Sequence, residues 1–356
     1  MTALERLLIA RIEAGGPITL AEYMAECLMH PEHGYYSTRD PFGAAGDFTT
    51  APEISQMFGE VLGLCLAQSW LDQGAPARVT LAELGPGRGT LMADILRATT
   101  RVPGFHAAVQ VVLVEASPTL RAVQARVLAD HGPIWVDQLD CLPEQPLFLI
   151  ANEFFDALPI SQFQREEAGW CQRLVGVTDG ALAFGLSAAL PPQAVGPRFA
   201  ADPPGTVVEL CPAVPEIAGV IRARIGAHGG VAIVIDYGGW RSKGDTLQSL
   251  RQHVPVHPLA HPGEADLTAH VDFEALALAF GPPHTGLTDQ GTLLRRLGMD
   301  QRMARLAGGL TGMALDSHLA AHRRLTDPAE MGSLFKAIAF HPSGTAAPQG
   351  FDPFDA

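Results

Sequence analysis

Residues 79–90 carry the sequence Val-Thr-Leu-Ala-Glu-Leu-Gly-Pro-Gly-Arg-Gly-Thr. An apolar run opens this stretch, and helical periodicity over residues 91–99 follows it. The pattern therefore predicts a buried strand, a tight turn and a helix. Glycines at such a turn permit left-handed backbone and let a ligand approach the main chain closely. Because a plain strand-to-helix turn has the same pattern, the flanking sequence must decide between a structural turn and a binding loop.

Apolar runs alternate with amphipathic runs on both sides of this stretch. Strands are predicted at 109–114, 134–136, 147–151, 207–210, 231–235 and 334–340, and helices at 118–129 and 214–225. Strands that are apolar on both faces and alternate with helices indicate a parallel sheet covered on both sides. The predicted fold class is therefore α/β, with a doubly wound, Rossmann-like sheet.

Two regions and two insertions complete the predicted organisation. Residues 1–75 have helical periodicity and are expected to form a helical N-terminal region and lid, with one long helix from Glu53 to about Leu71. Residues 76–356 are expected to hold the sheet domain. Turn-separated strands predict an antiparallel β insertion at about 160–190. Leucine spacing predicts a helical insertion, or cap, at about 290–326.

Composition narrows the class of protein. The 356 residues are 47% hydrophobic, which suffices for a sizeable core. No apolar run reaches the roughly 18 residues of a membrane span. The acidic, amphipathic N-terminus argues against a secretory signal and against a transit peptide. A net charge of −14 without a Lys/Arg cluster disfavours nucleic acid as a partner. The five scattered cysteines indicate reduced thiols.

The spacing around the glycines favours S-adenosylmethionine over a dinucleotide. The glycines Gly85, Gly87 and Gly89 follow a G-x-G-x-G pattern, and Thr90 stands where a dinucleotide fingerprint has its third glycine. Glu83 precedes the first glycine by two residues. Its carboxylate would attract the cationic methionine part of S-adenosylmethionine and repel a pyrophosphate. Glu83 and the three glycines are therefore candidate cofactor-binding residues.

Two further strands end in polar residues that could bind the same cofactor. Glu115 follows the strand 109–114, and a carboxylate there can accept both hydrogen bonds of a ribose diol. It could equally cap a helix or lie on the surface. Asp137 and Gln138 follow the strand 134–136 and are candidates for contact with the adenine.

The strand 147–151 leads into the candidate catalytic residues Asn152, Glu153 and Asp156. Ligands of open α/β sheets bind beyond the carboxyl ends of the strands. Glu153 and Asp156 are three residues apart, which would place them on one side of a helical turn. Paired carboxylates could grip a guanidinium and localise its charge. They could also shape the loop through hydrogen bonds to the backbone.

A histidine series offers a metal site but does not support one. His253, His257 and His261 are spaced by four, as on one face of a helix. Prolines at 255, 258 and 262 exclude a continuous helix, and no cysteine or other ligand set joins the histidines. We therefore expect no metal.

The chain resembles the MidA-like methyltransferases over nearly its whole length. The mitochondrial members of that family are complex I assembly factors that methylate an arginine. The resemblance is carried by the runs His33–Ser37, Gly46–Ser55, Glu83–Thr90, Asn152–Pro159, Ile235–Gly238 and Asp266–Phe273. It implies a class I methyltransferase fold and S-adenosylmethionine as the cofactor. It also implies that residues 46–55 form a lid over the cofactor or the substrate, with Asp47 and Glu53 as the polar residues of the lid. Together with the N-terminal sequence, the resemblance implies a bacterial cytoplasmic protein, or one of the mitochondrial matrix if a targeting segment has been removed.

The resemblance further implies a protein substrate. The expected reaction is symmetric dimethylation of an arginine in the large, quinone-proximal subunit of NADH:ubiquinone oxidoreductase. Two alternatives stay open: a small-molecule or RNA methyltransferase, and an assembly chaperone that binds the cofactor with little catalysis. A nicotinamide dehydrogenase is disfavoured by Glu83 and Thr90.

Overall fold

The computed structural model describes residues 1–38 and 49–354, which form two compact units. The sheet unit comprises Thr49–Phe155, Pro215–Gly238 and Phe273–Ala356, and the insertion unit comprises Met1–Phe48, Asp156–Val214 and Gly239–Asp272. This division does not follow the predicted boundary near residue 75. The reason is that the helix ending at Asp72 contributes its buried side chains to the core of the sheet unit.

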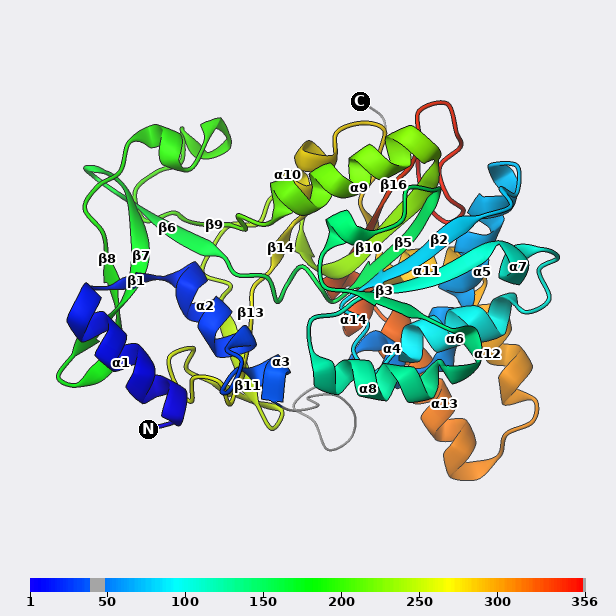
Figure 1. The fold of residues 1–356 in the computed structure, drawn as a ribbon, viewed down its shortest axis with the longest axis horizontal. Helices are drawn as coiled ribbons and strands as arrows, with labels where there is room; N and C mark the ends of the chain where they lie inside the picture. Colours follow the sequence, from blue (N-terminus) through cyan, green and yellow to red (C-terminus); the bar gives the residue numbers. More distant parts are fainter. Residues whose placement is uncertain (39–48, 355–356) are drawn as a thin grey trace. The chain divides into compact units, whose positions relative to one another are not determined.

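The sheet unit is built on one twisted sheet (Figure 1). Its strands lie in the order β4 (Ile134–Val136), β3 (Val109–Val114), β2 (Val79–Leu84), β5 (Leu147–Asn152), β10 (Gly230–Gly239), β16 (Phe335–Phe340) and β15 (Thr288–Asp289). Pairing is parallel from β4 to β10, and β16 is antiparallel to both of its neighbours. The strand order reverses between β2 and β5, so ligands are expected beyond their carboxyl ends. The predicted doubly wound sheet is confirmed.

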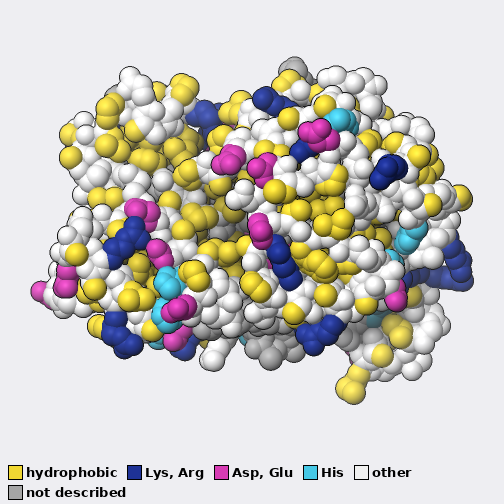
Figure 2. All heavy atoms as spheres, in the orientation of Figure 1, with side chains coloured by type: hydrophobic (Ala, Val, Ile, Leu, Met, Phe, Trp, Pro, Cys, Tyr) yellow, Lys and Arg dark blue, Asp and Glu magenta, His cyan; other side chains and the backbone are white. Residues whose placement is uncertain are grey.

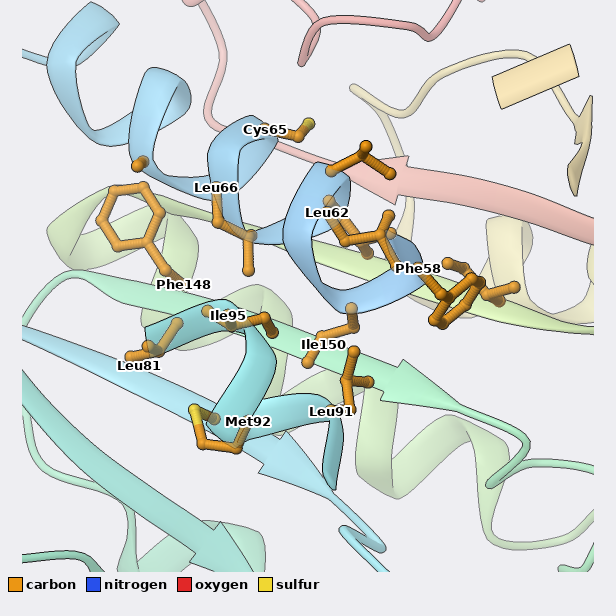
Figure 3. Packing of buried hydrophobic residues seen from close by; sticks show 14 of the residues in the cluster. Phe58, Leu62, Cys65, Leu66, Leu81, Leu91, Met92, Ile95, Phe148 and Ile150 are labelled. Atoms are coloured by element: carbon orange, nitrogen blue, oxygen red, sulfur yellow. The ribbon is translucent and has the colours of Figure 1, made fainter. Parts of the chain in front are cut away.

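Helices cover both faces of this sheet. On one face, apolar side chains of α5 (Gln56–Asp72) and α6 (Thr90–Thr99) pack on β2 and β5, as Figure 3 shows for Phe58, Leu62 and Ile95. On the other face, Phe280 of α10 (Phe273–Phe280) stacks on Phe340, with ring centroids 3.6 Å apart. Every residue of β2 and β5 is buried as a result, which explains why their sequences are mostly apolar.

The predicted helix from Glu53 to about Leu71 is broken in two. Ser55 is extended, with φ of −159°, so α4 (Ala51–Ile54) ends before α5 begins at Gln56. The Ser55 hydroxyl accepts a hydrogen bond from the Met57 amide at 3.2 Å and so caps α5. Periodicity alone could not show this break, because both helices are apolar on their buried sides. The break sets the direction of α4, and with it Glu53, independently of α5.

The insertion unit combines helices with an antiparallel sheet. Its strands follow the order β1 (Ile18–Thr19), β7 (Gly169–Thr178), β6 (Ser161–Glu166) and β9 (Val207–Leu210), with β8 (Ala181–Leu186) beside β7. The structure thus has antiparallel strands where the β insertion was predicted. The strand at 207–210 was assigned to the parallel sheet, which is wrong, because it pairs antiparallel with β6.

The remaining elements complete both units. The insertion unit also contains α1 (Ala3–Gly15), α2 (Leu20–Met29), α3 (Tyr35–Thr38) and a small sheet of β11 (Gln248–Arg251), β12 (Val254–Val256) and β13 (Asp266–Thr268), and ends at β14 (Val271–Asp272). The sheet unit also contains α7 (Phe105–Ala108), α8 (Pro118–Val127), α9 (Val214–His228), α11 (Gln290–Arg296), α12 (Met299–Ala307), α13 (Gly312–Thr326) and α14 (Met331–Leu334). Helices therefore occupy most of the range 290–326, where the helical insertion was predicted.

Two surface properties bear on function. In the part of the chain that the structure describes, no helix is both long and apolar enough to cross a membrane. On the face shown in Figure 2, Lys and Arg side chains are scattered among acidic ones and form no single basic patch.

Candidate functional site

The loop after β2 is a glycine loop in left-handed backbone. The φ angles of Gly85, Gly87 and Gly89 are +58°, +51° and +84°, values that L side chains rarely adopt. A Cβ atom on Gly85 would also lie only 2.9 Å from Cδ2 of the Phe154 ring. Both the backbone conformation and the close packing therefore require glycine, and Gly85 remains exposed at the turn.

Glu83 lies at the end of β2 and is almost fully buried, with 3% of its surface exposed. Its carboxylate accepts a hydrogen bond from the Met92 amide in the first turn of α6. Its Oε2 has no hydrogen-bond partner among the described residues. Burial raises the pKa of Glu83 to about 8, and the nearby charge of Glu115 adds to the effect. An unpartnered buried carboxylate is costly, so this position suits a bound cationic group.

Glu115 follows β3 and has both carboxylate oxygens held. Its Oε1 accepts a hydrogen bond from the Ser117 amide at 2.7 Å, and its Oε2 accepts one from Gln124 Nε2 at 3.2 Å. Burial raises its pKa. Ser117 caps α8, so Glu115 does support a helix start, as the alternative interpretation proposed. Each carboxylate oxygen can accept a second hydrogen bond, which leaves capacity for a ribose diol.

The residues after β4 are exposed. Asp137 pairs with Arg121 at 2.5 Å, and Arg121 Nε also donates to the Glu115 carbonyl at 2.7 Å. Gln138 is exposed beside it. Both residues lie at the carboxyl end of the strand next to β3, and contact with the adenine stays a prediction.

The loop after β5 presents Glu153. Glu153 Oε1 accepts hydrogen bonds from the Ala51 amide at 2.9 Å and from Asn152 Nδ2 at 3.1 Å. Its backbone is left-handed, with φ of +51°, although it is not a glycine. Burial raises the pKa of Glu153 to about 7. Asn152 is buried, and its Oδ1 has no hydrogen-bond partner within the described ranges.

The prediction that Glu153 and Asp156 share one side of a helical turn is wrong. A left-handed residue opens this segment, and residues 153–155 are not helical. The segment is instead held by Asp236 in the carboxyl half of β10. Asp236 Oδ2 accepts hydrogen bonds from the amides of Phe154 at 3.2 Å and Phe155 at 3.0 Å. Asp156 belongs to the insertion unit, where its carbonyl accepts a hydrogen bond from the Ala269 amide at 3.0 Å.

Of the two candidate lid residues, the structure describes Glu53 but not Asp47. Glu53 on α4 accepts a hydrogen bond from the Thr90 hydroxyl at 2.5 Å, so it lies beside the glycine loop. Asp47 lies outside the described residues. The sheet unit therefore brings Glu53, Glu83, Glu115 and Glu153 to the region where the loops after β2, β3 and β5 lie.

Sequence reasoning missed two residues of this region. Asp236 could have been found, because it directly follows the apolar run 231–235, as Glu115 follows the predicted strand 109–114. Gln124 is a polar residue within the buried stripe Leu120, Gln124 and Leu128, which is spaced by four. A polar side chain on such a stripe is a signal for a buried hydrogen-bonding role, though it does not name the partner. In the same described ranges, no cluster of His, Cys, Asp and Glu could hold a metal ion.

The chain is similar to named proteins over almost its full length. A Drosophila melanogaster relative named "Protein arginine methyltransferase NDUFAF7 homolog, mitochondrial" is 35% identical over 97% of this chain and 86% of its own. The human protein arginine methyltransferase NDUFAF7 is 36% identical over 96% of this chain and 84% of its own. A Burkholderia thailandensis structure bound to S-adenosyl-homocysteine has a TM-score of 0.84 and 30% identity, covering 98% of this chain and 94% of that one.

The strand order, the glycine loop and the acids at the strand ends, together with these similarities, define a class I S-adenosylmethionine-dependent methyltransferase. The chain belongs to the family described as S-adenosyl-L-methionine-dependent methyltransferases, whose model matches residues 61–287. The predicted fold class, enzyme class and cofactor are therefore confirmed, as is the resemblance drawn from the sequence.

Proposed function

We propose that this methyltransferase methylates an arginine side chain of a protein. The observation that carries the proposal is the half-buried carboxylate of Glu153, which hydrogen bonds from the Ala51 amide and Asn152 hold at the carboxyl end of β5. The names of the curated relatives, protein arginine methyltransferases at 35–36% identity, support the same acceptor.

The residues of the sheet unit fit the cofactor. The glycine loop and Glu83 would hold its cationic methionine part, and the unpartnered Glu83 Oε2 supports that assignment. Glu115 would accept hydrogen bonds from the ribose hydroxyls, and Asp137 and Gln138 would face the adenine. When bound, S-adenosylmethionine supplies an electrophilic methyl group on a sulfonium.

Glu153 would bind and orient the acceptor. A guanidinium stays protonated at physiological pH, because its pKa lies far above that range, so its nitrogens are poor nucleophiles until the charge is localised. A carboxylate does this through charge-assisted hydrogen bonds in a shielded site. The pKa of Glu153, about 7, also suits it to accept the proton that the methylated nitrogen releases. The Ala51 amide and Asn152 orient the carboxylate. For Asp156 we keep the candidate catalytic role, which is supported only by its position in the sequence, three residues after Glu153.

We extend the proposal to the acceptor and the product. The family resemblance supports the large, quinone-proximal subunit of NADH:ubiquinone oxidoreductase as the acceptor protein. It also supports symmetric dimethylation as the outcome. Glu153 explains neither the acceptor protein nor the symmetry of the product, since one carboxylate can bind any arginine.

Tandem mass spectrometry after incubation with methyl-labelled S-adenosylmethionine tests the proposal. We expect labelled arginine in a recombinant fragment of that subunit, with fragment ions of the symmetric dimethyl form. A fragment in which each arginine is replaced by lysine is the control and should stay unlabelled. Label on lysine, or on no protein acceptor in a whole lysate, would contradict arginine methylation.

A further inference from the structure

The side chain of Gln124 links three segments of the sheet unit. Gln124 lies on α8 with 0% of its surface exposed. Its Nε2 donates to the Gly87 carbonyl at 2.7 Å and to Glu115 Oε2 at 3.2 Å, and its Oε1 accepts from the Trp135 indole at 2.8 Å. One amide group thereby joins the glycine loop after β2, the acid after β3 and the strand β4.

The hydrogen bond from Gln124 to Gly87 fixes the backbone of a residue that has little conformational preference of its own. Gly87 adopts left-handed backbone with φ of +51°, and glycine populates left- and right-handed regions about equally. The hydrogen bond from Gln124 selects one orientation of the Gly87 carbonyl. The stem of Gln124 also lies beneath the loop, since a Cβ atom on Gly89 would be 3.5 Å from Gln124 Cγ.

The second bond fixes the carboxylate of Glu115. The Ser117 amide holds Oε1, and Gln124 holds Oε2. With both oxygens held, the remaining lone pairs of the carboxylate point in set directions. A ligand group that binds there then loses less conformational freedom on the protein side.

We propose that Gln124 is a positioning residue for the cofactor, which aligns the glycine loop with Glu115 so that one ligand contacts both. The proposal rests on the cofactor placement given under the proposed function. It predicts that a ligand spanning both contacts depends on Gln124 more than a ligand that contacts Glu115 alone. Such a difference between ligands would not arise from a general loss of stability.

Gln145 provides a matched control on the same sheet. Its Nε2 donates to the Thr80 hydroxyl at 2.9 Å and to Gln110 Oε1 at 3.4 Å. Thr80 and Gln110 lie near the amino ends of β2 and β3, at the edge of the sheet opposite the glycine loop. Gln124→Leu and Gln145→Leu therefore remove the same chemical group from opposite ends of the same strands.

Titration calorimetry of the two variants with two ligands is the test. S-adenosyl-homocysteine spans both contacts, and 5′-methylthioadenosine lacks the amino-acid part. In Gln124→Leu we expect the Kd for S-adenosyl-homocysteine to rise by about tenfold or more, and that for methylthioadenosine by less than about threefold. The KM for S-adenosylmethionine should rise in parallel while kcat at saturation changes less than about twofold. Gln145→Leu should change none of these values.

Equal losses for both ligands, or the same losses in Gln145→Leu, would overturn the proposal. If Gln124→Leu fails to fold, Gln124→Met keeps the length of the side chain and removes the donor to Gly87 and Glu115 without adding a charge beside Glu115; the same split between ligands is expected. Glu115→Ala tests the premise separately with methylthioadenosine. If Glu115→Ala binds methylthioadenosine as tightly as the wild type, the cofactor placement is refuted. If Glu115→Ala binds it more weakly but Gln124→Leu changes the Kd of neither ligand, only the role of Gln124 is refuted.

Discussion

The loops after β2 and β5 leave adjacent parallel strands, and both require left-handed backbone, yet they use different residues to adopt it. The loop after β2 has a glycine at each left-handed position, Gly85, Gly87 and Gly89. The loop after β5 has Glu153 at φ of +51°. The two loops also touch, because Phe154 packs against Gly85.

The difference indicates what each loop contributes. A left-handed residue with a side chain costs roughly 1–2 kcal/mol, which glycine avoids. The chain accepts that cost at Glu153 and offsets it with hydrogen bonds: the Glu153 amide donates to the Ile235 carbonyl at 3.0 Å, and Asp236 holds the next two amides. Strain of this kind persists at functional sites where the surroundings enforce it. We infer that the first loop is built to bring backbone close to a ligand, and the second to present a carboxylate.

The largest expected effect comes from removing that carboxylate charge. In Glu153→Gln, turnover on an arginine acceptor should fall by about 100-fold or more, the size of a typical transition-state electrostatic contribution. Affinity for S-adenosyl-homocysteine should stay within about twofold, because the assigned cofactor residues are untouched. Paired calorimetry and methyl-transfer assays measure both values. Glu216→Gln, on the exposed start of α9, is the matched control. Normal turnover by Glu153→Gln would disprove the carboxylate mechanism.

The next largest effect should appear in the first loop. Gly87→Val should weaken S-adenosyl-homocysteine binding by more than about tenfold, because a branched side chain strains the loop and occupies the space of the ligand. Gly132→Val is the control: Gly132 has φ of +56°, and an added Cβ there meets nothing within 4 Å. It should lose stability without losing affinity. Equal affinities in calorimetry of the two variants would mean that the loop does not face the cofactor.

Sequence patterns predicted the first loop better than the second. An apolar strand, a glycine turn and a helix are local features, so residues 79–99 were assigned correctly without any tertiary information. The parallel, doubly wound character of the sheet followed from the same local pattern, because its strands are mostly apolar and alternate with helices. The positions of Glu83 and Glu115 at strand ends followed as well.

The second loop could not be predicted, because distant residues determine its shape. Asp236, about eighty residues later, holds the amides of Phe154 and Phe155 and so replaces the helical turn that the spacing of Glu153 and Asp156 suggested. The Ala51 amide, a hundred residues earlier, orients the Glu153 carboxylate. Helical spacing rules assume local hydrogen bonds, and here tertiary hydrogen bonds prevail.

The pH dependence of stability should also distinguish the loops. The pKa of Glu153 is about 7 in the folded protein and near 4.5 when exposed, so the folded state retains a proton that the unfolded state releases. The unfolding free energy of the wild type should therefore fall relative to Glu153→Gln as pH rises from 4.5 to 7, and level off above. The slope is at most about 1.4 kcal/mol per pH unit. Urea unfolding of both proteins measures it. Because Glu83 titrates in both proteins, its contribution cancels in the comparison. A difference in unfolding free energy that does not change with pH would contradict the raised pKa of Glu153.

The smallest effect tests whether the two loops act as one unit. Gly85→Ala places a Cβ 2.9 Å from the Phe154 ring and also strains the backbone at φ of +58°. The ring must shift, and Glu153 lies next to it in the chain. We expect kcat to fall severalfold, with a loss of stability of about 1–3 kcal/mol.

Phe154→Leu should relieve the contact but not the backbone strain. A double-mutant cycle should then show a coupling of about 1 kcal/mol between the two positions. Gly132→Ala supplies the strain without the contact. If Gly85→Ala costs no more than Gly132→Ala, and its effect adds to that of Phe154→Leu, then the glycine loop and the carboxylate loop are mechanically independent.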